Sequence, residues 1–404
     1  MNNVLFLFSA NDVSFALFPY LLKYKVESET NFINKPYYVG DIDSSVLNGK
    51  FKFKFKDTNI NLFYLKDDVF SSKENILSNL NDFAKEIFYD KVYIFREWST
   101  FNKNLKSFGN VEIIYYKADE NFHITDEEVK EFLSEYRIIS SASISFSDKN
   151  FYFEPLINLF VFYYIFGFDY LSYSKLDVKK TNLMGMYYIK SYKSVRDKFY
   201  DEFIKPIFEK QNTELVKIYD TQCDKPQLIS QLLQKYKGYW SLNHNAMYSD
   251  YITSVCGFIF DTLNHTSIDG PANATGRSYI NEKALKGIIY SKLNIPFIID
   301  TNTNNFEILN KLGFWFLNSE FYQFDTDKLI EEKVIPMENS IINAMEYLIS
   351  IYKENDCDLD KTHQSLVEKY GDKMQNNYNT FIKYLTDAPN SDKLLNFILY
   401  GNEN

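Results

Sequence analysis

A basic turn in front of a predicted helix is the part of this sequence best suited to bind an anion. The run RSYINEK (277–283) follows a loop-like stretch rich in Asn, Gly, Ser and Thr (264–276) and precedes an apolar-periodic segment. Free backbone N–H groups and the positive end of the dipole attract anions to a helix N-terminus. Arg277 and Lys283 would add positive charge for a diphosphate, and Glu282 could accept hydrogen bonds from a ribose. The same residues also fit a plain helix start, with Glu282 favoured by the dipole and Lys283 in solvent.

A second basic turn, KSYKSVR (190–196), follows the apolar run at 183–189 and also leads into a predicted helix. Two such turns in one α/β unit can converge at the carboxyl edge of its sheet, where these domains bind ligands. The chain has no Walker A, G-x-G-x-x-G, G-x-S-x-G or HExxH sequence. Their absence from the sequence argues against P-loop enzymes, kinases, simple dehydrogenases and zincins.

The elements that would position these turns alternate between strands and helices. In the first part of the chain, strands are predicted at 4–8, 92–95, 111–116 and 137–145, and helices at 73–90 and 125–136. This alternation indicates a doubly wound α/β sheet. The segment 50–64 alternates with period two and predicts one half-exposed strand. The apolar segment 151–171 predicts a core helix and no membrane span, because Glu154, Asn158 and Asp169 interrupt it.

The same alternation starts again after residue 180. Strands are predicted at 183–189, 215–219 and 296–300, with an apolar stretch at 251–260 and helices at 194–210, 225–237 and 283–293. The tail from 326 is predicted to be helical, with breaks at Pro336, Gly371 and Pro389. No repeat period of a solenoid recurs, so two α/β domains are expected.

The composition narrows the class of protein. The net charge of -10 argues against a surface that binds polyanions over its whole extent. The 37 Phe and 33 Tyr fit AT-rich coding in a low-GC bacterium or its phage better than an aromatic binding surface. The 3 Cys and 4 His are too widely spaced for a disulfide framework or a zinc finger. The apolar start lacks a basic region and is interrupted by Asp12, so we expect no signal peptide and a cytoplasmic location, in a bacterium or a phage-infected host.

The order of features from 181 to 300 resembles the nucleotide-sugar-binding half of the α-1,3-fucosyltransferase family, a GT-B glycosyltransferase group. The corresponding pieces are KSYKSVRDKFYDEF, QKYKGYW, GFIFDTL, SYINEKALKGIIYSKL and NIPFIID. IPFIID with KLGF (311–314) is also similar to phage-encoded glycosyltransferase-like proteins. The most specific element of the resemblance is the run YINEK (279–283).

The resemblance implies a GT-B-like α/β fold, in which two Rossmann-like domains face a cleft. The expected parts are an N-terminal acceptor domain (1–150), a connecting helical segment (151–180), a donor-binding domain (181–325) and C-terminal helices that pack back on the domains (326–404). By the family's pattern, Arg196 and Lys283 hold the donor diphosphate, Glu282 binds the ribose and Tyr279 lines the nucleotide pocket. The expected donor-binding residues are Lys190, Arg196, Asp261, Arg277, Tyr279, Asn281, Glu282 and Lys283.

Three departures from the family's pattern leave the donor's identity open. Asn281 replaces the usual Thr, Asp261-Thr262 stands in place of Glu-Asn, and the loop between Asp261 and Tyr279 is longer. The donor is expected to be a nucleotide sugar such as a GDP- or UDP-sugar, with no further cofactor. No DxD-like motif stands at a loop placed like a metal site, so inverting transfer without a metal is expected.

The acceptor hydroxyl would need a general base from the first domain. Glu97, directly after the run VYIF (92–95), is the first candidate, and Asp12 at the end of the first strand is the second. Glu97 beside Arg96 and Trp98 fits a structural ion pair equally well.

Three functions therefore stay open at the level of sequence. The first is a glycosyltransferase acting on a glycan or small acceptor. The second is a phage-type glycosyltransferase acting on a modified DNA base, for which the basic segments are 50–56, 175–198 and 233–237. The third is a non-catalytic protein that uses a GT-B-like scaffold for binding or assembly.

Overall fold

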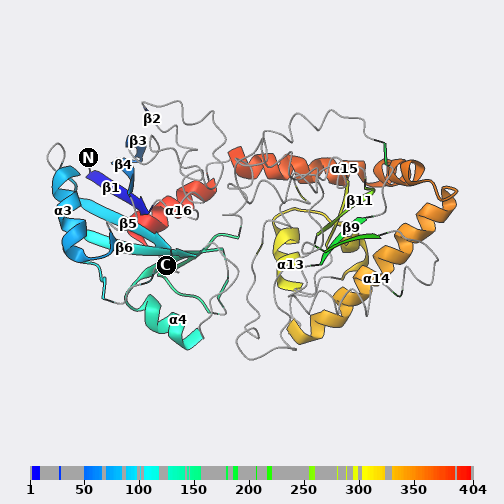
Figure 1. Cartoon of the computed structure of the whole chain (residues 1–404), viewed down its shortest axis with the longest axis horizontal. Helices are drawn as coiled ribbons and strands as arrows, with labels where there is room; N and C mark the ends of the chain where they lie inside the picture. The colour runs from blue at the N-terminus through cyan, green and yellow to red at the C-terminus, as the bar shows by residue number, and fades with distance from the viewer. Residues whose placement is uncertain are drawn as a thin grey trace. The chain divides into compact units, whose positions relative to one another are not determined.

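The structure is a computed structural model of the chain, drawn in Figure 1. The residues that it describes are 2–9, 27–28, 50–65, 70–83, 88–97, 101, 104–117, 126–141, 143–144, 146–155, 179–180, 185–189, 206, 216–220, 254–259, 280, 288, 294–298, 303–323, 330–386 and 389–401. The chain divides into two compact units. Unit 1 comprises residues 1–165 and 386–404, and unit 2 comprises residues 166–385.

Unit 1 is built on an eight-stranded sheet with the order β2-β3-β4-β1-β5-β6-β7-β8. Its strands are β1 (Asn2–Ser9), β2 (Glu27–Ser28), β3 (Lys50–Phe55), β4 (Thr58–Leu65), β5 (Lys91–Glu97), β6 (Val111–Lys117), β7 (Arg137–Ser140) and β8 (Phe151–Phe153). Neighbouring strands from β4 to β8 are parallel, and β2 and β3 extend one edge in antiparallel fashion. This confirms the α/β fold class with a mostly parallel sheet.

The order of the parallel strands places β1 between β4 and β5. The chain passes from β1 toward one edge of the sheet, returns to β5 on the other side of β1, and then builds toward the opposite edge. In open α/β sheets the point where the strand order reverses is the usual ligand site, at the carboxyl ends of the strands. The β1–β5 pair is this switch point in unit 1.

The centre of the sheet is buried on both faces. All residues of the run 4–8 in β1 are buried, which explains why this strand is continuously apolar and not alternating. On one face Phe6 packs against Phe95, with ring centroids 5.2 Å apart. On the other face, Phe132 of the helix α4 (Asp126–Leu133) packs on Tyr115 of β6.

Two further helices of unit 1 are α3 (Lys73–Phe83) and α16 (Pro389–Tyr400). Phe397 of α16 packs on Tyr152 of β8, with ring centroids 5.3 Å apart. The register places Tyr152 on the face opposite Tyr115, so α16 and α4 cover opposite faces of the sheet. Figure 1 shows them on its two sides.

The segment predicted as one strand at 50–64 is a hairpin, so that prediction was wrong in its topology. β3 and β4 are antiparallel and meet at Lys56 and Asp57, where Lys56 has a φ of 52°. The turn is so short that the period-two pattern runs through it unbroken. Lys52 and Lys54 are exposed while Phe53 and Phe55 are buried, as expected for a half-exposed strand.

Three other boundaries in unit 1 differ from the prediction. The strand predicted at 137–145 ends at Ser140, and residues 88–90 of the helix predicted at 73–90 are not helical. The core helix predicted at 151–171 begins instead as the strand β8, and its part from 156 on lies outside the described residues. In each case the apolar pattern is compatible with either element.

Unit 2 contains two pairs of parallel strands. Its elements are β9 (Gly185–Ile189), β10 (Val216–Asp220), β11 (Cys256–Ile259), β12 (Ile295–Ile298), α13 (Thr303–Lys311), the 3-10 helix η8 (Leu317–Phe321), α14 (Ile330–Glu354) and α15 (Leu359–Thr386). β9 and β11 fall within the runs predicted for them, and β10 and β12 overlap theirs, with β10 ending one residue later and β12 beginning one residue earlier than predicted. The helices predicted at 194–210, 225–237 and 283–293 lie outside the described residues, except for Pro206 and Ile288, which are helical.

Two of the three breaks predicted in the C-terminal tail were wrong. Pro336 lies inside α14 and Gly371 inside α15. A proline costs a helix about 3 kcal/mol and a glycine about 1 kcal/mol, and the buried residues along both helices offset these losses. The break falls at Asp356 and Cys357, each with a φ of 58°, and Pro389 begins α16 as predicted. None of the helices in the described part of the chain is long and apolar enough to span a membrane.

Candidate functional site

Most residues predicted for the site lie outside the described part of the chain. These are Asp12, Lys190, Arg196, Asp261, Arg277, Tyr279, Asn281, Glu282 and Lys283. Glu97 is the last residue of β5, where its backbone is paired with Tyr116 of β6. Its side chain is outside the description. The topology therefore brings Glu97 to the carboxyl edge of the sheet, next to the switch point.

The carboxyl ends of β1 and β5 adjoin each other at this edge. Phe8 pairs with Phe95, and β1 ends one residue later at Ser9, whereas β5 continues through Arg96 to Glu97. The two Phe rings stack, with centroids 4.3 Å apart and an interplanar angle of 5°. This stack forms a rigid apolar floor below the strand ends.

Arg96 is the described polar side chain at the carboxyl edge with the most unusual environment. It is 7% exposed, and its Nη1 atom is buried with no hydrogen-bond partner among the described residues. It takes part in none of the ion pairs formed within the described ranges. A guanidinium stays protonated in a protein, so burial cannot be relieved by loss of a proton. An unpaired buried charge is costly unless something binds to it.

Arg96 borders an aromatic cluster formed by Phe101, Tyr115, Phe132 and Tyr136. Its pairing partner on β6 is Tyr115. The ring of Tyr115 lies 5.3 Å from that of Phe101 and 5.3 Å from that of Phe132, centroid to centroid. Burial is the main cause that raises the pKa of Tyr136. The cluster gives Arg96 an apolar surrounding, in which its charge interacts more strongly with an anion than it would in water.

The sequence analysis missed Arg96 as a candidate and considered it only as an ion-pair partner of Glu97. A signal was present, because a charged residue one place before the end of a central, doubly buried strand is unusual. That its Nη1 has no hydrogen-bond partner among the described residues could be seen only in the folded structure.

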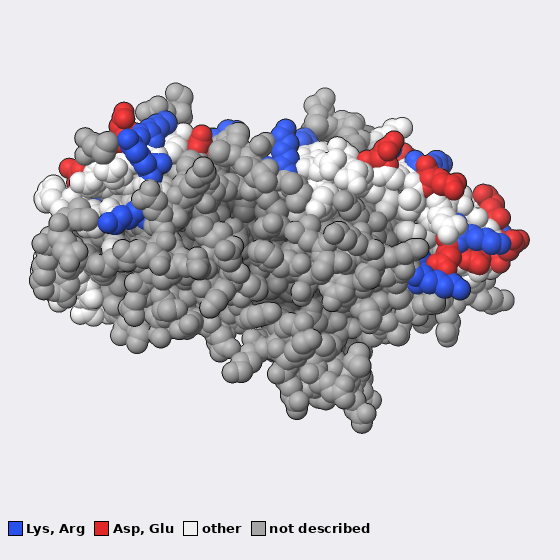
Figure 2. Space-filling view, turned by 90° about the horizontal axis from the view of Figure 1, so that it is seen from above, with Lys and Arg blue, Asp and Glu red and all other residues white. Residues whose placement is uncertain are grey.

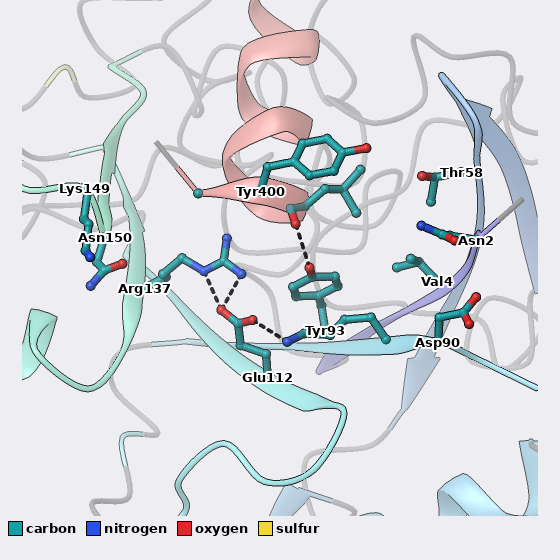
Figure 3. A pocket seen from close by; sticks show the side chains of 13 residues that line it. Asn2, Val4, Thr58, Asp90, Tyr93, Glu112, Arg137, Lys149, Asn150 and Tyr400 are labelled. Carbon is teal, nitrogen blue, oxygen red and sulfur yellow. Dashed lines mark hydrogen bonds and ion pairs between the residues drawn. The ribbon is translucent and has the colours of Figure 1, made fainter. Parts of the chain in front are cut away.

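The amino edge of the same sheet holds a cavity of about 630 Å³, shown in Figure 3. It opens where β1, β4, β5, β6 and β7 begin, and the end of α16 forms one of its walls. Its lining residues are Asn2, Val4, Thr58, Asp90, Lys91, Tyr93, Glu112, Arg137, Lys149, Asn150, Leu399, Tyr400 and Gly401.

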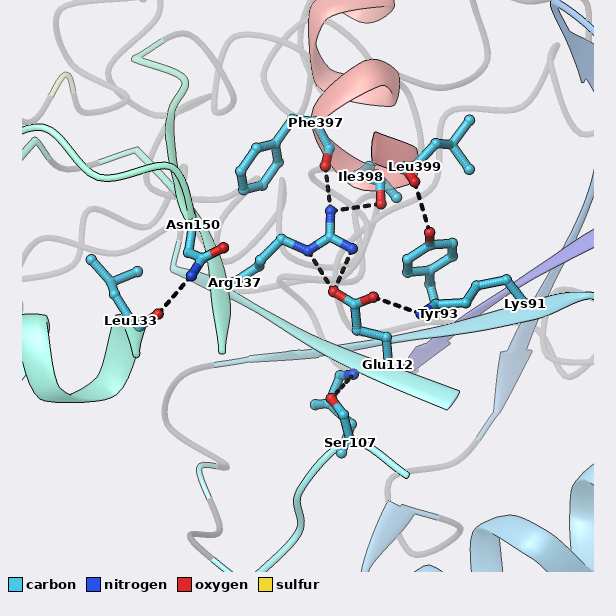
Figure 4. A network of polar contacts seen from close by, with 11 residues as sticks. Lys91, Tyr93, Ser107, Glu112, Leu133, Arg137, Asn150, Phe397, Ile398 and Leu399 are labelled. Atoms are coloured by element: carbon cyan, nitrogen blue, oxygen red, sulfur yellow. Dashed lines mark hydrogen bonds and ion pairs between the residues drawn. The ribbon is translucent and has the colours of Figure 1, made fainter. Parts of the chain in front are cut away.

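The charges at the amino edge are largely paired with one another (Figure 4). Arg137 binds the Glu112 carboxylate through Nε and Nη2, and its Nη1 donates to the carbonyls of Phe397 and Ile398. Lys91 Nζ lies 3.1 Å from Glu112 Oε2. These contacts join β5, β6 and β7 to the last turn of α16.

The end of α16 needs such donors, because the last carbonyls of a helix have no partner within it. The hydroxyl of Tyr93 donates to the Leu399 carbonyl at 3.1 Å, beside the two carbonyls bound by Arg137. Gly401, with a φ of 76°, donates its N–H to Phe397 O at 2.9 Å. Gly401 thus caps the helix in the left-handed backbone conformation. The negative end of the helix dipole also favours a cation such as Arg137 at this position.

Tyr93 remains a hydrogen-bond donor at neutral pH. Burial raises the pKa of its phenol, Arg137 opposes this, and the negative charge of Glu112 reinforces it. The amino edge is therefore a structural latch, which we define as Tyr93, Glu112 and Arg137 bound to one another and to the end of α16.

Unit 2 contains a third buried cation, Lys180. Its Nζ atom donates to Asn294 Oδ1 at 3.1 Å, and its backbone N–H donates to the Asp360 carboxylate. Burial lowers the pKa of the Lys180 amine to about 8 and raises that of the neighbouring Cys256 thiol. Within the described ranges, no group of His, Cys, Asp and Glu side chains could hold a metal ion.

Comparisons with known proteins place the chain in no family. No protein-family model matches it, and no curated protein matches it. Among solved structures, the G domain of the FeoB iron transporter of T. maritima is 18% identical over 35% of this chain and 87% of that chain, with a TM-score of 0.20. A TM-score this low carries no argument about fold or function.

Proposed function

We propose that this protein is a glycosyltransferase that moves a sugar from a nucleotide-sugar donor to the hydroxyl of a glycan or small acceptor. The observation that carries the proposal is the presence of two α/β units in one chain. The last helix of the chain, α16, belongs to the first of these units. That organisation supports the GT-B-like fold implied by the resemblance of residues 181–300. The reaction is proposed to take place in the cytoplasm.

The donor side of the proposal rests on the sequence pattern and on where the strands of unit 2 end. β9 ends directly before the turn 190–196, and β11 ends two residues before Asp261. Because β9 and β11 also lie near each other, residues that follow their carboxyl ends are suited to a common donor site. In that site Arg196 and Lys283 would neutralise the leaving diphosphate, and Glu282 would bind the ribose.

The acceptor side is proposed at the carboxyl edge of the unit 1 sheet. Glu97 is the proposed general base that takes the proton of the acceptor hydroxyl as the anomeric bond forms, with Asp12 as second choice. A direct attack of this kind inverts the configuration at the anomeric carbon. Fixed positive charges of the protein would neutralise the leaving diphosphate, so the proposed reaction uses no metal.

The net charge of -10 favours a small or glycan acceptor over DNA. Of the three basic segments considered for DNA, 50–56 is described, whereas 233–237 and most of 175–198 lie outside the described residues. On the described part of the face drawn in Figure 2, basic side chains form separate small groups, some of which have acidic side chains beside them. Binding to a DNA backbone would favour a continuous basic surface. The two exposed lysines of β3, Lys52 and Lys54, form a smaller basic area than a DNA backbone would favour. They fit the charged side chains that are usual near the edge of a sheet.

A thermal-shift series on the full chain with GDP-, UDP-, CMP- and ADP-sugars tests the proposal. One nucleotide sugar should raise the melting temperature by about 5 °C at a hundredfold excess over its Kd. Glu282→Ala and Lys283→Ala should abolish this rise, whereas Glu346→Ala, an exposed carboxylate on α14, should keep it. The proposal fails if no nucleotide sugar stabilises the protein, or if both site variants respond like the native chain.

A further inference from the structure

Among the described residues, the buried cations Arg96 and Lys180 and the largely buried Arg137 differ in which groups surround their charge. Arg137 is bound to a carboxylate and to two helix carbonyls. Lys180 donates to an amide oxygen, and burial lowers its pKa to about 8, so that it can lose its proton near neutral pH. Arg96 is as buried as Lys180, but its Nη1 has no partner in the described part of the chain and a guanidinium keeps its proton. Its charge must therefore be met from outside these residues.

The position of Arg96 indicates what kind of molecule meets this charge. It is the second-last residue of β5, at the switch point of the sheet, beside the end of β1 and one residue before Glu97. Substrates and cofactors of open α/β domains bind at this place.

We infer that Arg96 binds an oxyanion group, a phosphate or a carboxylate, of a substrate at the carboxyl edge of the unit 1 sheet. The planar guanidinium presents parallel N–H donors that match the two oxygens of either group. The neighbouring Tyr115 and its aromatic cluster keep water away from one side of the charge, which strengthens the interaction.

An oxyanion site at Arg96 also indicates the chemical class of the acceptor, a step that rests on the proposed glycosyltransferase function. The donor-binding residues are expected in unit 2, so an oxyanion bound in unit 1 belongs to the acceptor. The register places Arg96 and Glu97 on opposite faces of the sheet at the end of β5, because Arg96 pairs with Tyr115 and Glu97 with Tyr116. An acceptor that reaches across the carboxyl edge would place its acidic group on Arg96 and its hydroxyl near Glu97. The acceptor is thus an acidic sugar or a phosphorylated molecule and not a neutral one.

The test measures the melting temperature of the full chain with inorganic phosphate and, separately, with D-glucuronate. At millimolar concentration at least one of them should stabilise the native protein, and the response tells a phosphate from a carboxylate ligand. Arg96→Met should remove this stabilisation. Without ligand, Arg96→Met should melt at the same temperature as the native chain or higher, because a buried unpaired charge has been replaced by an apolar chain of similar length.

Three further variants keep the test decisive. Arg137→Met should melt at a lower temperature yet keep the response to the anion, because its guanidinium belongs to the latch. Arg96→Lys, which keeps the charge but loses the fork, should weaken anion affinity about tenfold and serves if Arg96→Met does not fold. Lys283→Ala should also keep the response, which excludes binding of the probe at the donor site.

Two results would overturn the inference. One is the absence of any stabilisation of the native chain by both anions; the other is an equal response in Arg96→Met. If no nucleotide sugar stabilises the protein but an anion does, the glycosyltransferase proposal is rejected and the anion site at Arg96 is supported. Conversely, if a nucleotide sugar stabilises the protein but neither anion does, the glycosyltransferase proposal is supported and the anion site at Arg96 is rejected.

Discussion

The two edges of the unit 1 sheet place arginines in opposite situations. At the amino edge, Arg137 is surrounded by Glu112 and by the carbonyls that end α16, and its side chain is 11% exposed. At the carboxyl edge, Arg96 is buried to a similar extent, yet its Nη1 has no partner in the described ranges. Arg137, which holds the end of a helix, has a partner for each of its side-chain nitrogens. Arg96, at the edge where substrates bind in this fold class, has a nitrogen without a partner among the described residues. The difference separates a structural edge from a functional one.

Removal of Arg137 should have the largest effect on stability. Arg137→Ala removes the donor to the Ile398 carbonyl and one of the two donors to the Phe397 carbonyl, which keeps the N–H of Gly401. It also leaves Lys91 as the partner of Glu112. We expect a loss of about 3 kcal/mol in the free energy of unfolding, measured by urea titration of the full chain. Lys149→Ala, a change of an exposed residue lining the same cavity, is the matched control and should alter stability by less than about 0.5 kcal/mol. Equal effects of the two variants would contradict a latch.

The pH dependence of stability should reveal Lys180, the buried cation that can lose its proton. Its pKa is about 8 in the folded protein and near 10.5 in an unfolded chain. The unfolded state therefore binds more protons between these values, and stability rises with pH in that window. We expect a gain of about 2 kcal/mol between pH 7.5 and 9.5 in urea titrations. Lys180→Met should flatten this rise; the same slope in the variant would show that other groups cause it.

A smaller effect is expected from Tyr93 in the latch. Tyr93→Phe removes one hydrogen bond to the end of α16 and should cost about 1 kcal/mol at pH 7. Because burial raises the pKa of this phenol, the folded state keeps a proton above pH 10 that the unfolded state loses, so stability falls as pH rises there. The fall should be shallower in Tyr93→Phe, by urea titration at pH 9.5 and 10.5. An unchanged slope would mean that the latch does not depend on this proton.

The sequence predicted the parts of the fold that depend on local pattern. Continuous apolar runs gave the buried strands β1, β5 and β6, and their alternation with helices gave the α/β class. The hairpin at Lys56 was missed because its turn carries neither Gly nor Pro. The breaks at Pro336 and Gly371 were wrong because packing of long helices overrides a single unfavourable residue.

The site was harder to predict because its defining features are pairings between distant residues. Glu97 could be predicted as a candidate, since a carboxylate after a strand is visible in the sequence, and the structure shows that it ends β5. Its role as a general base stays a prediction. Arg96 and Arg137 look alike there, and only the folded chain shows that Arg137 meets Phe397, 260 residues away, whereas Arg96 meets no comparable partner among the described residues. The donor-binding residues predicted in unit 2 stay a prediction.

The functional role of the carboxyl edge is tested most directly by titration calorimetry of inorganic phosphate and of D-glucuronate into the native chain and into Arg96→Met. We expect one of the two anions to bind the native chain with a measurable heat and to show no binding to Arg96→Met, while Arg137→Met binds it like the native chain. Equal binding to native and Arg96→Met protein, or binding to neither, would contradict a functional carboxyl edge built around Arg96.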